Sequence, residues 1–156
     1  MHAGDLVEDF ELQADDGRMV KLSTELEKGP VVLFFYPRAL TPGCTAESCH
    51  FRDLANEFAD LGAQRIGISA DPVSRQQKFS TKYGLDFPLL SDPDRIVARA
   101  FGAKRPGLLF NRRATFVIGP DRRLLAEINS EFATDRHADE ALSVLRAAAG
   151  HSGDAG

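Results

Sequence analysis

An unbroken apolar run, followed at once by a turn and then by a cysteine, constrains this chain more than any other feature of its sequence. The run is 31–35, Val-Val-Leu-Phe-Phe, and Tyr36 and Pro37 close it. Consecutive β-branched and aromatic residues indicate a strand that is buried on both faces, as in a sheet covered by helices. Cys44 follows where the next helix would begin. The unpaired N–H groups and the positive end of the helix dipole stabilise a thiolate there, so the sequence predicts a nucleophilic cysteine.

The second cysteine, Cys49, lies on the opposite face of the same predicted helix. If 43–61 is one helix, its buried face is formed by Phe51, Leu54, Ala55 and Phe58. At about 100° per residue, Cys44 lies within roughly 40° of the centre of that face and Cys49 about 180° from it. Free cysteine is usually buried, so a cysteine on the polar face needs an explanation. It is either a tolerated surface thiol or a second thiol that captures an oxidised Cys44.

The spacing of the two cysteines excludes a disulfide within an intact helix. Five residues along a helix separate the two Cα atoms by roughly 8.6 Å, whereas a disulfide needs about 4.4–6.8 Å. Pairing therefore requires the first turns to unwind, and Thr41, Pro42 and Gly43 favour such a rearrangement. The sequence thus predicts a redox switch rather than a structural disulfide.

The residues around Cys44 resemble the signature of the peroxiredoxins. Pro37-x-x-x-Thr41-x-x-Cys44 matches the Pro-x-x-x-Thr/Ser-x-x-Cys pattern of that family. The run Thr-Pro-Gly-Cys-Thr, followed by Glu47 and Cys49, is similar to the Q-type subgroup, also called bacterioferritin-comigratory proteins. The resemblance extends more loosely over 5–149. It includes Phe-Pro-Leu-Leu-Ser-Asp-Pro from position 87 and Arg-x-Thr-Phe-Val-Ile from position 113, whereas Arg-Pro-Gly-Leu-Leu-Phe at 105–110 lies in a variable segment.

The resemblance assigns roles to three residues of the turn. It implies that Cys44 is the peroxidatic cysteine, whose thiolate attacks the peroxide O–O bond. The hydroxyl of Thr41 would hold the peroxide and contact the sulfur, although threonine at this place could also be a simple N-cap. Pro37 lacks an N–H and would shield the thiolate from water, although a proline here could also just end the strand.

The resemblance also assigns roles to an arginine, a glutamate and the second cysteine. Arg113 matches the family's arginine and would stabilise the thiolate and the leaving oxyanion. Glu47 falls on the core side of the first helical turn, about 20° from its centre, and we expect it to orient Arg113; the alternative is a helix-end acid that faces water. Cys49 would be the resolving cysteine, within the same chain.

Turn signals divide the chain into alternating strands and helices without a linker between domains. Hairpins are predicted around Asp-Asp-Gly at 15–17 and Gly-Pro-Asp at 119–121. Between and after them we expect a short helical turn at 23–25, strands at 31–35 and 65–69, and helices at 72–83, 93–102 and 138–149. This order predicts a mixed α/β sheet covered on both faces, and the resemblance implies a thioredoxin-like fold with an N-terminal β-hairpin. We expect a single domain over 1–149 and a flexible C-terminal tail at 150–156.

Composition limits the other functions that this chain could have. Its 156 residues and net charge of −4 fit one domain without the basic stripe that nucleic acid requires. No run reaches transmembrane length and no signal peptide is recognised, which favours the cytoplasm. The four histidines show no ligand spacing with the two cysteines, so no metal or cofactor is expected.

Three alternatives stay open on the sequence alone. A thioredoxin-like disulfide reductase favours Cys-x-x-Cys, whereas four residues separate the cysteines here. A copper-binding module on the same fold would pair closer cysteines with a distant histidine, for which only His137 is available. A peroxide sensor would share the chemistry of a peroxidase. The resemblance favours the peroxidase, with a peroxide substrate, thioredoxin or a similar dithiol as reductant, and a monomer or weak homodimer as the active form.

Overall fold

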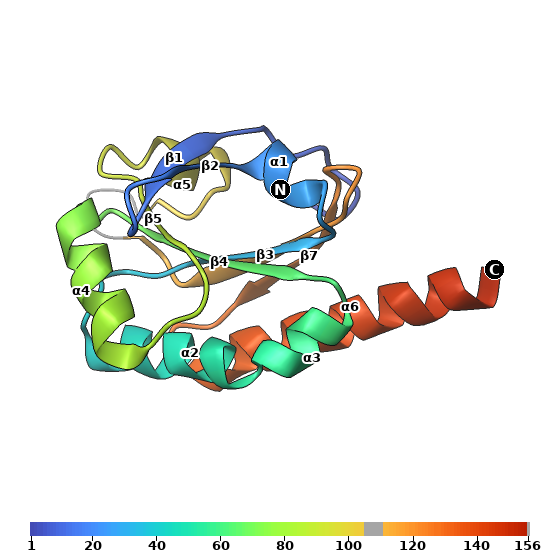
Figure 1. The fold of residues 1–156 in the computed structure, drawn as a ribbon. Coiled ribbons are helices and arrows are strands. Elements are labelled where there is room, and N and C mark those ends of the chain that lie inside the picture. The colour runs from blue at the N-terminus through green and yellow to red at the C-terminus, as the bar shows by residue number, and fades with distance from the viewer. Residues whose placement is uncertain (105–110, 156) are drawn as a thin grey trace.

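The protein is built on one mixed β-sheet with helices on both faces (Figure 1). The computed structural model describes residues 1–104 and 111–155, with side chains described as far as residue 149. The strands are β1 (Glu11–Ala14), β2 (Met19–Lys21), β3 (Val31–Phe35), β4 (Gln64–Ser69), β5 (Leu89–Ser91), β6 (Ala114–Ile118) and β7 (Leu124–Asn129). The helices are α1 (Leu22–Leu26), α2 (Pro42–Asp53), α3 (Ala55–Asp60), α4 (Val73–Tyr83), α5 (Ile96–Ala100) and α6 (Thr134–Ala155).

The strand order places the site-bearing strand near the middle of the sheet. The order is β2-β1-β5-β4-β3-β6-β7. Strand β3 pairs in parallel with β4 and antiparallel with β6, and β4 pairs in parallel with β5. The two predicted hairpins are present, as β1–β2 and β6–β7. The mixed sheet and the N-terminal hairpin expected from the sequence are therefore confirmed.

Strand β3 lies between two hydrophobic cores. Val31, Leu33 and Phe35 belong to the core beneath α1 and α5, whereas Val32 and Phe34 belong to the core formed with α2, α3, α4 and α6. All five side chains are fully buried, as the unbroken apolar run predicted. Figure 1 shows α2, α3 and α6 on one side of the sheet and α1 and α5 on the other.

The single helix predicted over 43–61 is wrong, because the structure has two helices there. Helix α2 ends at Asp53, and Leu54, with φ −97° and ψ 21°, leaves the helical conformation before α3 begins at Ala55. Phe51 and Phe58 still pack into the same core. The apolar spacing continues across the break, and for that reason the sequence indicated one helix.

Other elements differ from the prediction mainly in their limits. Strand β5 was not predicted, and it joins the hairpin strand β1 to β4. Pro72 is the N-cap of α4 rather than its first residue. Helix α5 spans only Ile96–Ala100 of the helix expected over 93–102. Helix α6 begins before residue 138 and runs into 150–156; the flexibility of that tail stays a prediction.

The motif at 105–110 lies outside the described residues. Within the described part of the chain, no helix has both the length and the apolar character needed to cross a membrane.

A glycine in β4 leaves space for the aromatic side chains that pack between the sheet and α2. Gly67 pairs with Phe34, and the Phe34 ring stacks on Phe51 of α2 with centroids 4.2 Å apart. A Cβ at Gly67 would lie 2.9 Å from Phe34 Cζ and 2.8 Å from Leu89 Cδ2. The absence of a side chain at this position therefore leaves room for the Phe34 ring that stacks on Phe51.

We predict that Gly67→Ala lowers the free energy of unfolding by about 1–3 kcal/mol, because the added methyl group overpacks the core. Urea denaturation measures the change. Gly119→Ala is the matched control, because its Cβ would meet the end of the Asp121 side chain at 3.0 Å, and that side chain can rotate away. The control should lose less than about 1 kcal/mol. Equal losses in the two variants would contradict this account of Gly67.

Candidate active site

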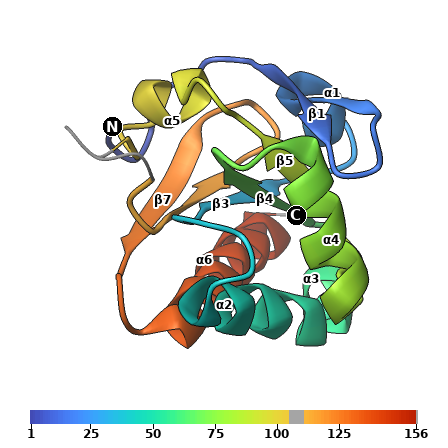
Figure 2. The same ribbon diagram turned by 90° about the vertical axis from the view of Figure 1, so that its left-hand side faces the viewer.

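The turn that carries Cys44 lies at the carboxyl end of β3, where ligand sites in such sheets are found. Arg113 directly precedes β6, and Ala114 of β6 pairs with Phe35 at that same end of β3. The sheet register therefore brings Arg113 to the turn, although 69 residues separate it from Cys44. Figure 2 shows the turn running from β3 to the start of α2, between α4 and the connection from β7 to α6.

The start of α2 is set by four consecutive residues. Leu40 has a left-handed backbone, with φ 68°. Thr41 is the N-cap in an extended conformation, and Pro42 occupies the first turn, where its missing N–H costs nothing. A Cβ at Gly43 would lie 3.0 Å from Arg113 Nη2. Glycine at this position therefore allows the guanidinium to approach the first turn of the helix.

Cys44, Arg113 and Glu47 form a buried chain of contacts. Arg113 Nη2 lies 3.5 Å from Cys44 Sγ and donates to it. Arg113 Nη1 donates to Glu47 Oε1 at 2.7 Å. Cys44 and Glu47 are fully buried and Arg113 is 5% exposed. A cation and the N-terminal end of a helix thus meet at one sulfur, where both can stabilise negative charge.

Arg113 also forms hydrogen bonds with the connection between β7 and α6. Its backbone N–H donates to Glu131 Oε1 at 3.1 Å, and its Nε donates to the Glu131 carbonyl at 3.2 Å. Burial alone would lower the pKa of Arg113, but the neighbouring charges of Glu47 and Cys44 raise it above the usual value. The guanidinium therefore stays charged and fixed in direction.

Glu47 fulfils the expectation of a core-facing carboxylate that contacts Arg113. Burial raises the pKa of Glu47 from 4.5 to about 8, and this outweighs the opposite effect of Arg113. Among the residues that the structure describes, its Oε2 has no hydrogen-bond partner, which agrees with the direction of the shift. Near neutral pH Glu47 therefore does not fully cancel the charge of Arg113, and positive charge remains available to the sulfur.

His137 belongs to this cluster, although no role in the peroxidase was predicted for it from the sequence. It lies fully buried in the first turn of α6, with Nδ1 2.7 Å from Thr115 Oγ1 and 3.7 Å from Glu47 Oε2. Nε2 lies 2.8 Å from the Ser130 carbonyl. A carbonyl can only accept, so Nε2 carries the proton and Nδ1 accepts from the Thr115 hydroxyl. Burial lowers the pKa of His137, which keeps the ring neutral.

A sequence signal for His137 did exist. It is spaced four and eight residues from Ala141 and Leu145, both buried on the same face of α6. That spacing marks a core-facing position for a histidine. This position was missed because the helix was expected to begin at 138, one residue after His137.

Thr41 and Pro37 lie in the turn but show no direct evidence of the roles that the resemblance assigned. The Thr41 hydroxyl donates to the Arg38 carbonyl at 2.7 Å, and no side-chain cap bond is made to α2. Thr41 is thus the N-cap residue of α2 by position, but its hydroxyl does not make the capping bond. Pro37 lies two residues after the end of β3 and is half-buried. The contact of Thr41 with peroxide and the shielding by Pro37 stay predictions.

Cys49 lies in the same helix as Cys44, and both thiols are free. Cys49 is half-buried rather than fully exposed. Because both residues belong to the unbroken helix α2, their spacing is helical, which is too long for a disulfide. A bond between them requires α2 to unwind.

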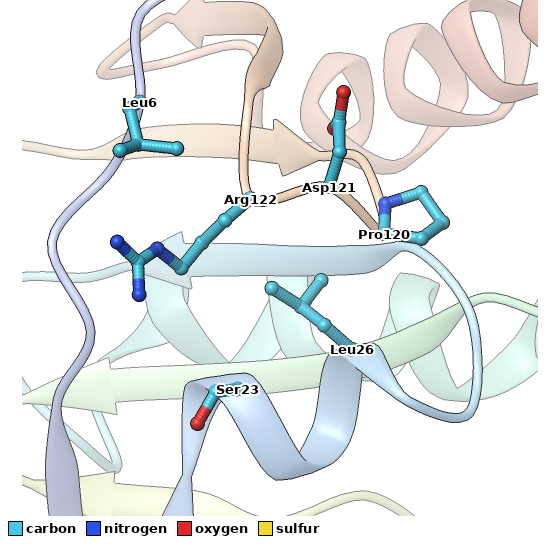
Figure 3. Close-up of a pocket in the computed structure, with 6 residues that line it drawn as sticks. All are labelled: Leu6, Ser23, Leu26, Pro120, Asp121 and Arg122. Carbon is cyan, nitrogen blue, oxygen red and sulfur yellow. The ribbon is translucent and has the colours of Figure 1, made fainter.

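A separate pocket lies away from this cluster (Figure 3). It is lined by Leu6, Ser23, Leu26, Pro120, Asp121 and Arg122. These residues surround the end of β3 at Val31, which pairs with Ile118. That end is at least about 13 Å from the turn that carries Cys44, given the rise per residue of a strand. The pocket therefore plays no part in the chemistry of the sulfur.

Comparisons with known proteins identify the family. Residues 3–126 match the AhpC/TSA family. The chain belongs to that family and is a peroxiredoxin of the Q type. The crystal structure of peroxidoxin BcpB from Mycobacterium tuberculosis is similar, with 56% identity, a TM-score of 0.90, and coverage of 94% of this chain and 97% of that one. Peroxiredoxin Bcp of Bacillus subtilis is 40% identical over 149 residues, 92% of this chain and 94% of its own.

A third relative has a described activity. The bacterioferritin comigratory protein of Xanthomonas campestris, described for alkyl peroxide reduction, is 32% identical with a TM-score of 0.83, over 93% of this chain and 99% of its own. The thioredoxin-like fold class expected from the sequence is confirmed by these neighbours. This peroxiredoxin is accordingly a thiol-dependent peroxidase.

We predict that Glu47 makes stability depend on pH. Its pKa in the native state, about 8, lies above the unfolded value of 4.5, so its favourable contribution is complete below the lower value and is lost as the pH rises to the upper one. Glu47→Gln removes this titration. Between about pH 5 and pH 8, the free energy of unfolding of the parent should fall relative to the variant by about 1–4 kcal/mol. Urea denaturation across this pH range measures it, and parallel curves would refute the assignment.

We predict that Arg113→Ala slows alkylation of Cys44 by iodoacetamide near neutral pH about 10-fold, because the thiolate loses its cation. The measurement is made in a Cys49→Ser background, so that only one thiol reacts. Arg112→Ala is the matched control, because the Arg112 guanidinium bonds the Gly102 carbonyl and approaches Glu127. Equal alkylation rates in the two variants would contradict a role for Arg113 in the reactivity of Cys44.

Proposed function

We propose that this peroxiredoxin reduces hydrogen peroxide and organic hydroperoxides with Cys44 as the peroxidatic and Cys49 as the resolving cysteine. The thiolate of Cys44 attacks one peroxide oxygen and breaks the O–O bond. The sulfur becomes a sulfenic acid, and the other oxygen leaves as water or an alcohol after it takes up a proton. The Cys49 thiol then displaces water from the sulfenic acid to form a disulfide, and an external dithiol reduces that disulfide in turn.

One observation carries the first step of the proposal. Cys44 Sγ lies at the N-terminal end of α2, 3.5 Å from the buried guanidinium of Arg113. The same donors that hold the thiolate can hold the oxygen that leaves with negative charge. Thr41, one turn before the cysteine, has a hydroxyl that can exchange its bond to the Arg38 carbonyl for one to the peroxide. We infer that Pro37 limits the access of water to this place.

The role of Cys49 is supported by its position in the same chain and helix. Its half-buried side chain becomes reachable by Cys44 only when the first turns of α2 open. Opening also withdraws the helix N–H groups from the sulfur, so the oxidised protein would not bind a second peroxide productively. Local unfolding of this kind draws on the less stable parts of a fold. Phe51, which stacks on Phe34, should hold the rest of α2 in place.

We propose thioredoxin, or a similar dithiol protein, as the reductant, and the cytoplasm as the compartment. A reducing compartment suits two free thiols that must be regenerated after each cycle. We expect the active form to be a monomer or a weak homodimer.

The two cysteine variants test the assignment of roles. Cys44→Ser should abolish peroxide consumption in the presence of thioredoxin, its reductase and NADPH. Cys49→Ser should retain the first reaction with peroxide but lose turnover, and Cys44 should then progress to sulfinic acid. Steady-state NADPH oxidation with hydrogen peroxide and cumene hydroperoxide, together with mass spectrometry of the oxidised protein, measures these outcomes.

Several outcomes would contradict the proposal. Turnover in Cys44→Ser would show that Cys44 is not the nucleophile. A dominant disulfide between two chains would remove the intramolecular role of Cys49. Reaction with peroxide in the parent without turnover by any dithiol reductant would favour a peroxide sensor, and reduction of insulin without peroxide consumption would favour a disulfide reductase.

A further inference from the structure

The turn before Cys44 is held by Arg75 of α4 and by Asp71, which lies two residues before that helix. Ala39, fully buried, lies in the middle of this turn. Its N–H donates to Asp71 Oδ2 at 2.7 Å, and its carbonyl accepts from Arg75 Nη2 at 2.8 Å. Asp71 and Arg75 are also an ion pair, with 3.1 Å between Oδ1 and Nε. Both backbone polar groups of one residue are therefore held by a single charged pair.

The charged pair is itself anchored to the sheet. Asp71 Oδ2 also accepts from Ser69 Oγ at 2.6 Å, and the Asp71 carbonyl accepts from Ser91 Oγ at 2.6 Å. The Ser69 hydroxyl in turn accepts from Gln76 Nε2 at 2.9 Å. These residues lie at the ends of β4 and β5 and in α4, so the sheet determines the position of Asp71.

The same network reaches the residue that closes β3. Tyr36 is fully buried, and its hydroxyl donates to Gln76 Oε1 at 2.6 Å. Burial raises the pKa of Tyr36 well above its usual value, so the hydroxyl remains a donor. Tyr36 and Ala39 are thus fixed through α4, on the side of the turn away from Arg113.

The residue directly after Ala39 has a left-handed backbone conformation. Leu40 has φ 68°, a left-handed conformation that is unfavourable for a residue with a side chain. Such a conformation persists only where its surroundings hold it on both sides. Here Ala39 is held on one side, and the first turn of α2 follows on the other. Release of that turn would let Leu40 relax without disturbing Ala39.

We propose that Asp71 and Arg75 are positioning residues for the attack on peroxide, and that they set the N-terminal limit of the unwinding at Leu40. They hold Ala39 so that Thr41 and the start of α2 keep the geometry that the attack requires. The positioning role concerns the peroxidase activity itself. The limit at Leu40 rests on the proposed Cys44–Cys49 disulfide.

The proposal makes opposite predictions for the two chemical steps. A loosened turn misplaces the attacking sulfur and its donors, so attack on peroxide becomes slower. The same change lowers the stability of the closed start of α2, so the opening that disulfide formation needs becomes easier. A substitution that only weakened the whole fold would not slow one step and accelerate the other.

Arg75→Ala is the variant that tests this, because Arg75 is half-buried and its loss leaves Asp71 bonded to Ser69. Lys78→Ala, which removes a charge from an exposed position of the same helix, is the matched control. Stopped-flow measurements separate the phase that depends on peroxide concentration from the later phase that does not. In Arg75→Ala the attack should slow about 5–10-fold and the later phase should accelerate at least about 2-fold. The control should change neither.

Amide exchange gives a second readout of the boundary. In the oxidised parent, exchange should accelerate from Leu40 to about His50, whereas the Ala39 amide, bonded to Asp71, should stay protected. In oxidised Arg75→Ala that protection should fall. Asp71→Asn, which keeps an acceptor for the Ala39 N–H but loses the charge, should lie between the parent and Arg75→Ala in both measurements.

Two results would overturn the proposal: unchanged rates in both phases of Arg75→Ala, or a parallel loss in both. Rapid exchange of Ala39 in the oxidised parent would move the boundary away from Leu40. If the parent formed no Cys44–Cys49 disulfide, the proposed redox cycle would fail, and with it the boundary at Leu40. The attack phase would still decide the positioning role.

Discussion

The buried guanidinium of Arg113 is the group on which the rest of this site depends. A charge with 5% of its surface exposed is tolerated only when it is paired and hydrogen-bonded. Here Arg113, directly before β6, takes its partners from two other parts of the chain: Cys44 and Glu47 of α2, and Glu131 before α6. The need to satisfy one cation therefore fixes the arrangement of a helix, a strand and a loop. Gly43 matters for the same reason, because a side chain there would displace the guanidinium.

The pairing is not a source of large net stability. Glu47 is fully buried with one oxygen unpartnered, and burial raises its pKa to about 8. Replacement of such a buried ion pair by apolar groups often costs nothing or even stabilises a protein. The pair is better understood as a device that keeps positive charge at the sulfur. If α2 unwinds, Cys44 and Glu47 move with it and Arg113 loses these two partners, which favours return of the helix once the disulfide is reduced.

The sequence predicted those parts of the molecule that depend on neighbours along the chain. The strand at 31–35 is buried on both faces because five apolar residues follow one another, and Cys44 lies at a helix start because Thr41, Pro42 and Gly43 precede it. Both could be inferred from local pattern. The place of Arg113 needed the family resemblance, since nothing local distinguishes it from Arg112. The break at Leu54 was missed because the apolar spacing continues across it.

Apart from the contact of Glu47 with Arg113, the contacts made across the fold at this site were not predicted. His137 reaches Thr115 and Glu47 only because α6 packs beneath β6, and no pattern near position 137 specifies that partner. From the sequence, Asp71 is only the residue that precedes the helix expected over 72–83. In the structure its carboxylate accepts a hydrogen bond from the N–H of Ala39. The turn before Cys44 is thus held from two directions, by Arg113 on one side and by α4 on the other. The pairing of β3 with β4 and with β6 places both supports at the carboxyl end of β3. A short, strained turn between two fixed supports can be rigid while the helix is closed and can open at one defined point.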